Sequence, residues 1–127
     1  MKRIINTSAA PQPIGPYSQA VQVGDTLYMS GQIALDPASG ELLTASLDVE
    51  THQVMKNLSA VLKAAGMSFE HVVKTGIFLK NMSDFPEVNT IYATYFNQNF
   101  PARETVEVAG LPKGVNVEIS MVAIAST

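Results

Sequence analysis

The chain has 127 residues, which is enough for one domain with its own hydrophobic core, and we expect a single domain over residues 1–127. Hydrophobic residues make up 46% of it and charged residues 15%, which is typical of a globular protein and excludes a disordered one. The formal net charge is −3, and the eight Lys and Arg residues never cluster beyond Lys2-Arg3. This distribution argues against nucleic acid as the main partner.

The absence of cysteine excludes disulfides, thiolate nucleophiles and zinc–thiolate sites. The two histidines, His52 and His71, lie far apart in the sequence, so we expect no metal site. The first ten residues lack the apolar run of a signal peptide, and no stretch approaches the length of a membrane span. We therefore expect a cytoplasmic protein without a membrane partner.

The first half of the chain predicts two strands and a long helix. Alternating hydrophobic residues over 19–34 are interrupted by Gly24-Asp25, which indicates two strands around a turn, and a short strand at 3–5 could precede them. A helix is predicted to begin near Ser46 or Asp48 and to end at Gly66. Its apolar stripe comprises Val54, Leu58, Val61, Leu62 and Ala65, and its polar face comprises Glu50, Gln53, Asn57 and Lys63. His52 lies outside the stripe and is expected to be solvated.

The second half predicts three strands and a second helix. Residues 71–80 form a strand whose core side is expected to be Val73, Ile77 and Leu79. Ser83 is the expected N-cap of a helix whose stripe comprises Val88, Ile91, Tyr92, Tyr95 and Phe96. Residues 103–109 and 115–124 alternate strongly and are expected to form a hairpin around 110–114.

This element order predicts an α+β fold with one mixed β-sheet and both helices packed on one face. No sequence remains to cover the other face of the sheet. Another subunit is the expected cover, because an uncovered apolar face is rare on a monomer.

The predicted hairpin brings three polar residues together. If Val106 pairs with Val117, Thr105 lies opposite Glu118, and Arg103 stands on the same face because side chains alternate along a strand. A guanidinium can bind a substrate carboxylate with two parallel hydrogen bonds, and a nearby carboxylate can activate a water. On the pattern alone, an ion pair between Arg103 and Glu118 on a solvated face is the simpler interpretation.

Four further residues have both a structural and a functional interpretation. Tyr17 ends the rigid turn 15–18 and is either packed on a neighbour or part of a pocket wall. Ser30 and Gly31 end a strand, where the glycine marks either a bulge or the close approach of a ligand. Asn89 lies among the stripe residues of the second helix as a capping or interface contact.

Three segments carry a family resemblance. They are residues 14–20 (IGPYSQA), residues 30–33 (SGQI) and the C-terminal block, which contains 101–103 (PAR), Val106, 111–113 (LPK) and 117–119 (VEI). In order and spacing, from about Ile14 to Ile124, they resemble the RidA/YjgF family of reactive intermediate deaminases, and the archetypal RidA subgroup in particular.

The resemblance implies a chorismate-mutase-like fold and a homotrimer with clefts between its subunits. It also implies hydrolysis of 2-aminoacrylate, 2-aminocrotonate or their imine tautomers (2-iminopropanoate and 2-iminobutanoate) to 2-keto acids and ammonia, without metal or cofactor. By the same resemblance Arg103 would anchor the substrate carboxylate and Glu118 would position or activate the water. The cleft would be lined by Tyr17, Ser30, Gly31, Asn89 and Thr105.

The chain departs from the family pattern at two positions. Many members have a small residue where this chain has Glu104, and many have Cys where it has Thr105. By alternation Glu104 points away from Arg103, so we expect the pocket to survive. The proposed chemistry uses water and needs no thiol.

Three other functions are considered. A non-catalytic trimer that binds small carboxylates or 2-keto acids would share the Arg103 pocket without using the water. Ribonuclease or translation-inhibitor activities, which some family members have been assigned, conflict with the acidic charge. Chorismate mutase chemistry would require several cations around a dicarboxylate, and the sequence offers one convincing arginine.

Overall fold

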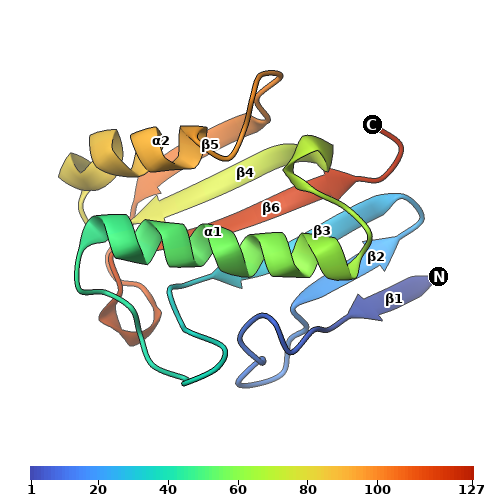
Figure 1. The fold of residues 1–127 in the computed structure, drawn as a ribbon, viewed down its shortest axis with the longest axis horizontal. Helices are drawn as coiled ribbons and strands as arrows, with labels where there is room; N and C mark the ends of the chain where they lie inside the picture. Colours follow the sequence, from blue (N-terminus) through green and yellow to red (C-terminus); the bar gives the residue numbers. More distant parts are fainter.

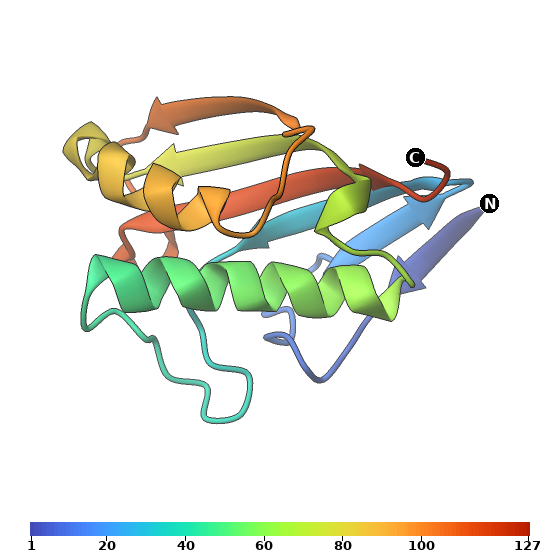
Figure 2. The same ribbon diagram turned by 45° about the horizontal axis from the view of Figure 1, so that its top comes forward.

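The structure, a computed structural model, describes all 127 residues and places both helices on one face of a six-stranded sheet. The helix layer and the sheet layer are seen in Figure 1, and Figure 2 shows the far face of the sheet left uncovered. The predicted α+β class and the packing of both helices on one face are confirmed. The elements are β1 (Lys2–Ile5), β2 (Ala20–Val23), β3 (Thr26–Gln32), α1 (Leu47–Ala64), β4 (Val72–Leu79), α2 (Phe85–Ala93), β5 (Ala102–Glu107) and β6 (Val117–Ile124).

The N-terminal strands form as predicted. β2 and β3 make an antiparallel hairpin in which Val23 pairs with Thr26, and Gly24 supplies the positive φ of +58° that the turn requires. β1 adds to the outer side of β2 in antiparallel register. In β4 the core residue at the start is Val72 instead of the predicted Val73, because a register shift between Val72 and Lys74 changes the alternation.

The predicted C-terminal hairpin is wrong. The strand order is β1-β2-β3-β6-β4-β5, so β4 lies between the two strands that were expected to pair. β5 runs parallel to β4 at the edge of the sheet and is mostly exposed, whereas alternate residues of β6 are fully buried. The physical reason is the burial: β6 presents Val117, Ile119, Met121 and Ala123 to the helices, which requires a central position. Alternation identifies the face of a strand but not its neighbour.

Helix α1 follows its prediction at both ends. Ser46 is the N-cap and accepts a hydrogen bond from the Val49 amide at 3.1 Å, and Gly66 follows the helix with a φ of +74°. The expected polar face is wrong in part, because Glu50 and Asn57 are 0% and 1% exposed. Both bond to backbone groups of neighbouring loops, which stabilises polar atoms away from water.

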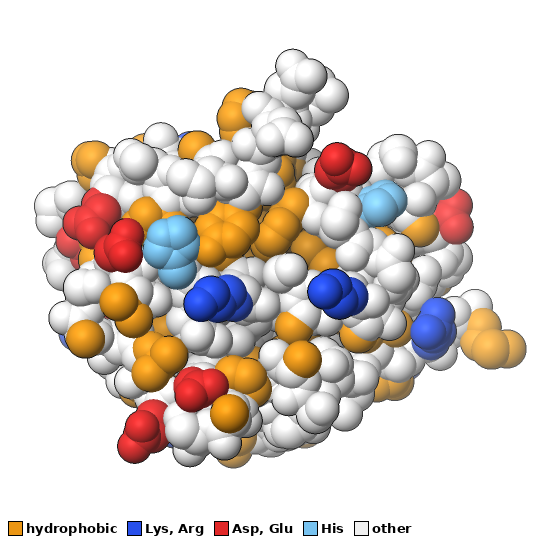
Figure 3. Space-filling model, viewed as in Figure 1, with side chains coloured by type: hydrophobic (Ala, Val, Ile, Leu, Met, Phe, Trp, Pro, Cys, Tyr) orange, Lys and Arg blue, Asp and Glu red, His pale blue; other side chains and the backbone are white.

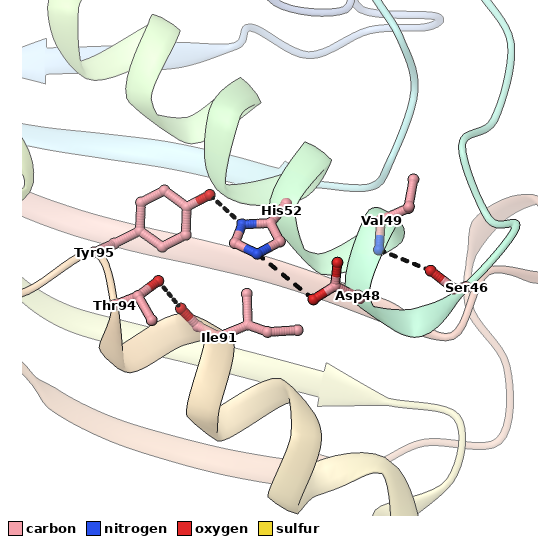
Figure 4. Close-up of polar contacts among 7 residues, drawn as sticks. All are labelled: Ser46, Asp48, Val49, His52, Ile91, Thr94 and Tyr95. Carbon is pink, nitrogen blue, oxygen red and sulfur yellow. Dashed lines mark hydrogen bonds and ion pairs between the residues drawn. The ribbon is translucent and has the colours of Figure 1, made fainter.

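Helix α2 begins later and ends earlier than predicted. A 3-10 turn over Met82–Asp84 precedes it, the N-cap position falls on Asp84, and Ser83 caps nothing. Tyr95 and Phe96 lie beyond its last residue and still pack against the core. The Tyr95 hydroxyl lies 2.6 Å from Nδ1 of His52, so that histidine joins α1 to the segment after α2 and is not simply solvated as expected (Figure 4).

The uncovered face of the sheet is apolar over several strands. Tyr28 is 54% exposed, and the neighbouring strands add further exposed hydrophobic side chains: Ile4 at 52%, Val23 at 47% and Val106 at 40%. Their register places them on the face opposite the helices. A patch of this kind is typical of an interface.

Candidate functional site

A cavity of about 480 Å³ lies beside the end of β3 and the start of β6. Four of the seven predicted site residues line it: Tyr17, Ser30, Gly31 and Glu118. Its other walls come from the loop before β2, the segment after β3 and the turn before β6. The structure therefore brings together residues that are up to about a hundred positions apart in the sequence.

Glu118 is held against the backbone of β3. A Cβ atom built at Gly31 would lie 2.9 Å from both Cδ and Oε2 of Glu118, which is closer than real contacts allow. The β3–β6 register shifts between Met29 and Gln32, so Gly31 lies in a bulge as well as at a close approach. The group that approaches it is the Glu118 side chain. Burial raises the pKa of the Glu118 carboxyl above its ordinary value.

The loop that carries Tyr17 is fixed to the same strand. The Ser30 hydroxyl donates to the Ser18 carbonyl at 2.6 Å, and the Ser30 amide donates to the Gln19 carbonyl at 3.0 Å. Gly15 has a φ of +122°, and the Tyr17 amide donates back to its carbonyl. The Tyr17 ring is thereby presented at the cavity with 53% of the residue exposed. The structure therefore places Tyr17 in a cavity wall, and its exposed surface still leaves room for packing on a neighbour.

Arg103 lies at a second cavity, of about 380 Å³, between β5 and α2. Its Nη1 donates to Oδ1 of Asn89 at 2.7 Å. Its guanidinium carbon lies 5.2 Å from the ring centroids of both Phe85 and Tyr92, within cation–π distance. No carboxylate lies within ion-pair distance of Arg103, so its charge is oriented by helix α2 but not neutralised.

Tyr92 is itself held in place by a hydrogen bond to the sheet. Its hydroxyl donates to Oγ1 of Thr75 in β4 at 3.0 Å, and burial is the main cause that raises the pKa of this phenol. Phe85 and Tyr92 were not predicted from the sequence as neighbours of Arg103. Their spacing with Asn89, at i, i+4 and i+7, places the three on one helix face and was the available signal.

The residues that follow Arg103 alternate as expected. Glu104 points to the other face, where its carboxylate lies 3.2 Å from Nζ of Lys74. Thr105 shares the Arg103 face, since these residues pair with Ile77 and Thr75 of β4. The Thr105 hydroxyl oxygen is buried and has no hydrogen-bond partner. Thr105 lines neither of the two cavities, and one oxygen each of Gln22 and Thr51 is likewise buried without a partner, so this hydroxyl by itself marks no ligand site.

The expected meeting of Arg103, Thr105 and Glu118 within one chain does not occur. Thr75 and Ile77, which pair with Arg103 and Thr105, face the helices, whereas Glu118 pairs with Phe78 on the opposite face of β4. The misplaced hairpin is the cause of the error, because inserting β4 between β5 and β6 changes which residues oppose each other. The sheet itself separates the guanidinium from the carboxylate, and no ion pair forms between them.

The histidines form no site with a metal-binding geometry. Nε2 of His52 lies 3.7 Å from the Asp48 carboxylate, and Nδ1 of His71 accepts a hydrogen bond from the Ser68 amide at 3.0 Å. No group of three or more His, Cys, Asp or Glu side chains gathers closely enough to hold a metal ion. Neither helix has the length and the hydrophobicity to span a membrane.

The model of the protein family described as endoribonuclease L-PSP matches residues 7–125 of this chain. The chain belongs to this family. Within this RidA/YjgF family, a Homo sapiens relative, a 2-iminobutanoate/2-iminopropanoate deaminase, is 52% identical over 124 residues, which cover 98% of this chain and 90% of the relative. A mite relative of the same name, from Dermatophagoides farinae, is 49% identical and covers 97% of this chain and 96% of its own length.

Solved structures of RidA/YjgF proteins share the fold. YyfA of the conserved Rid protein family, from Yersinia pestis, superposes with a TM-score of 0.95 at 48% identity, over 98% of this chain and 99% of its own. TdcF from E. coli with bound serine superposes with a TM-score of 0.92 at 36% identity, over 96% and 98%. The resemblance found in the sequence is therefore confirmed at the level of the family.

Proposed function

We propose that this protein hydrolyses 2-iminobutanoate and 2-iminopropanoate, formed from 2-aminocrotonate and 2-aminoacrylate, to 2-keto acids and ammonia. The curated relatives of about 50% identity carry this activity in their names. The observation that supports it in this chain is the Arg103 guanidinium, which is oriented by three groups of α2 and lacks a carboxylate partner. Such a group suits the one feature that all these substrates share, an α-carboxylate.

The reaction adds water across the imine bond. The water oxygen attacks C2 while its proton is taken up, and the resulting carbinolamine loses ammonia to give the 2-keto acid. A carboxylate with a raised pKa is a better base, so it can accept the first proton and return it to the departing nitrogen, and burial raises the pKa of Glu118. The bound carboxylate holds the electrophilic carbon in place, so the protein needs to supply only positioning and proton transfer.

The complete site is proposed to lie between two subunits of a homotrimer with the chorismate-mutase-like architecture. A single chain separates Arg103 and Glu118 by the thickness of its sheet, so one substrate cannot contact both within one chain. The uncovered apolar face around Tyr28 and Val106 provides the surface on which a neighbour would pack. One subunit would then contribute Arg103, Asn89 and Thr105 to a cleft whose other wall contains Glu118, Gly31, Ser30 and Tyr17 of the next.

Complementation between inactive variants tests this proposal. Arg103→Ala and Glu118→Gln are each expected to be nearly inactive alone, because each homotrimer lacks one half of every cleft. In trimers mixed at random in equal amounts, about a quarter of the clefts would combine both native residues, so about a quarter of the activity should return. Recovery of no activity in verified mixed trimers would contradict a site shared by subunits.

A non-catalytic binder of small carboxylates is the second candidate function. It is supported by the similar structure of E. coli TdcF, which holds a bound serine, a small carboxylate. Such a binder would use Arg103 without Glu118. Glu118→Gln separates the two functions: a deaminase loses imine turnover and keeps 2-keto acid binding, whereas a pure binder shows no turnover in the native protein either.

An RNA-directed function has less support. On the helix face in Figure 3, basic side chains lie singly among acidic and uncharged ones, without the continuous patch that phosphate binding requires. We expect RNA binding to be undetectable or insensitive to salt, as measured by titration between low and physiological ionic strength.

A further inference from the structure

Glu50 is a fully buried carboxylate that the proposed reaction does not use. It lies in the first turn of α1 and is 0% exposed, and no basic side chain lies within ion-pair distance of it. A buried carboxylate is costly unless several hydrogen bonds satisfy its oxygens. All three of its hydrogen bonds come from one short segment that lies 66 or 67 positions further along the chain.

The three donors stand immediately before Glu118. Oε2 of Glu50 accepts from the amides of Asn116 and Val117 at 2.8 and 3.2 Å. Oε1 accepts from the side-chain amide of Asn116 at 2.8 Å. The Asn116 carbonyl accepts from the Lys80 amide at 3.0 Å, so this short segment is fixed from both sides. The carboxylate thus binds the chain at the two residues that precede the proposed proton-transfer group.

The same segment forms a wall of the larger cavity. The turn Pro112–Gly114 leads into Asn116, and its residues Pro112 and Lys113 line the cavity beside Glu118. Asn57, another buried polar residue of α1, donates to the carbonyls of Ile33 and Leu35, which line the facing wall. Two of the three buried polar side chains of the helix, Glu50 and Asn57, are therefore bonded to backbone at the cavity. The hydroxyl oxygen of the third, Thr51, has no hydrogen-bond partner.

The tolerance for displacement at Glu118 is small. Its carboxylate is packed so closely on Gly31 that a single added carbon would lie 2.9 Å from it. A shift of the strand start at Asn116 would be transmitted directly to this contact, because Glu118 is only two residues away. In enzymes a misplacement of about 1 Å can reduce the rate on the order of a hundredfold.

We propose that Glu50 is a positioning residue for the reaction: through its hydrogen bonds to Asn116 and Val117 it sets the place of the Glu118 carboxylate. This inference rests on the proposed function, in which Glu118 handles the water. Glu50 acts by hydrogen bonding and not by its charge. A helix–strand contact that only stabilised the fold would affect stability without a selective effect on the chemical step.

The test compares variants of Glu50 by kcat, KM and thermal midpoint in the full-length protein, with imine generated freshly by a threonine dehydratase. Glu50→Ala is expected to lower kcat roughly tenfold to a hundredfold and to leave KM within about twofold, since Arg103 binds the carboxylate. Glu50→Gln should retain most of kcat, because its amide oxygen can accept both backbone hydrogen bonds while the Asn116 amide turns to accept from its NH₂. Should the Ala variant fail to fold, Glu50→Asp replaces it, as its carboxylate is one methylene too short to reach.

Leu62→Ala is the matched control, a buried residue of the same helix far from the cavity, which lowers the thermal midpoint without touching the cavity wall. The inference is supported if Glu50→Ala or Glu50→Asp loses kcat while Leu62→Ala, with a similar fall in thermal midpoint, does not. It is overturned if these variants match Leu62→Ala in kcat, or if Glu50→Gln is as slow as Glu50→Ala. Wild-type turnover in Glu118→Gln would instead overturn the role proposed for Glu118, and the absence of imine turnover in the native protein would overturn the proposed function itself.

Discussion

Adding one methyl group at Gly31 measures how closely Glu118 must be held. In Gly31→Ala the new Cβ would lie 2.9 Å from Cδ and Oε2 of Glu118, and even the closest ordinary contacts begin near 3.4 Å. The carboxylate must therefore retreat by about 0.5 Å or more. Because the obstructed atoms are the end of a flexible side chain, the fold should survive, with a cost typical of overpacking, about 1–3 kcal/mol in the free energy of unfolding.

We expect kcat for the imine to fall on the order of tenfold or more, since a displacement of about 1 Å can cost a hundredfold and this one is at least about half as large. The assay follows the release of 2-keto acid and ammonia from imine generated in place. Gly110→Ala is the matched control, because a Cβ there meets no atom within 4 Å and the variant should behave as wild type. An unchanged kcat in Gly31→Ala would refute the reasoning that Glu118 acts from this position.

Burial raises the pKa of the Glu118 carboxyl, so the folded state favours its protonated form. The stability that protonation provides is complete below the pKa of the unfolded chain and is lost as the pH rises through the higher pKa of the folded state. Glu118→Gln should therefore raise the thermal midpoint at pH 7 but not at pH 4. In the native enzyme, activity should fall on acidification at a higher pH than an ordinary Glu would give, and the pH profile of kcat measures this. Arg103→Ala should abolish most turnover of freshly generated 2-aminoacrylate and Arg103→Lys should lose about tenfold or more in kcat/KM, because an ammonium lacks the two-pronged geometry; full activity in either would contradict the anchor assignment. Tyr95→Phe removes the hydrogen bond between His52 of α1 and the segment after α2, and should cost about 0.5–1.5 kcal/mol in denaturant unfolding, without a change in kcat.

The fold class could be predicted from local patterns. Helix α1 has a cap at Ser46, a continuous apolar stripe and a terminating glycine at Gly66, and each of these signals acts within a few residues. The pairing of β5 and β6 could not be predicted in this way. Alternation assigns the face of a strand, whereas its neighbour depends on how the whole sheet buries Val117 and Ile119.

The same limit applies to the site. The residue types and the resemblance indicated Arg103 and Glu118, but the geometry inferred for them failed with the hairpin. The burial of Glu50 was also missed, because its position on the helix suggested a polar face and its three partners lie in a distant segment. Long-range contacts of this kind leave no local pattern in the sequence.

If, as proposed, Arg103 on one side of the β-sheet and Glu118 on the other act on the same substrate, the fold has a consequence for how the protein works in solution. A lone polypeptide would then carry two half-sites and no whole one. Specific activity should then decline on dilution, following the dissociation of the oligomer, well before any molecule unfolds. The quantity of active catalyst would depend on the association constant as much as on the amount of protein.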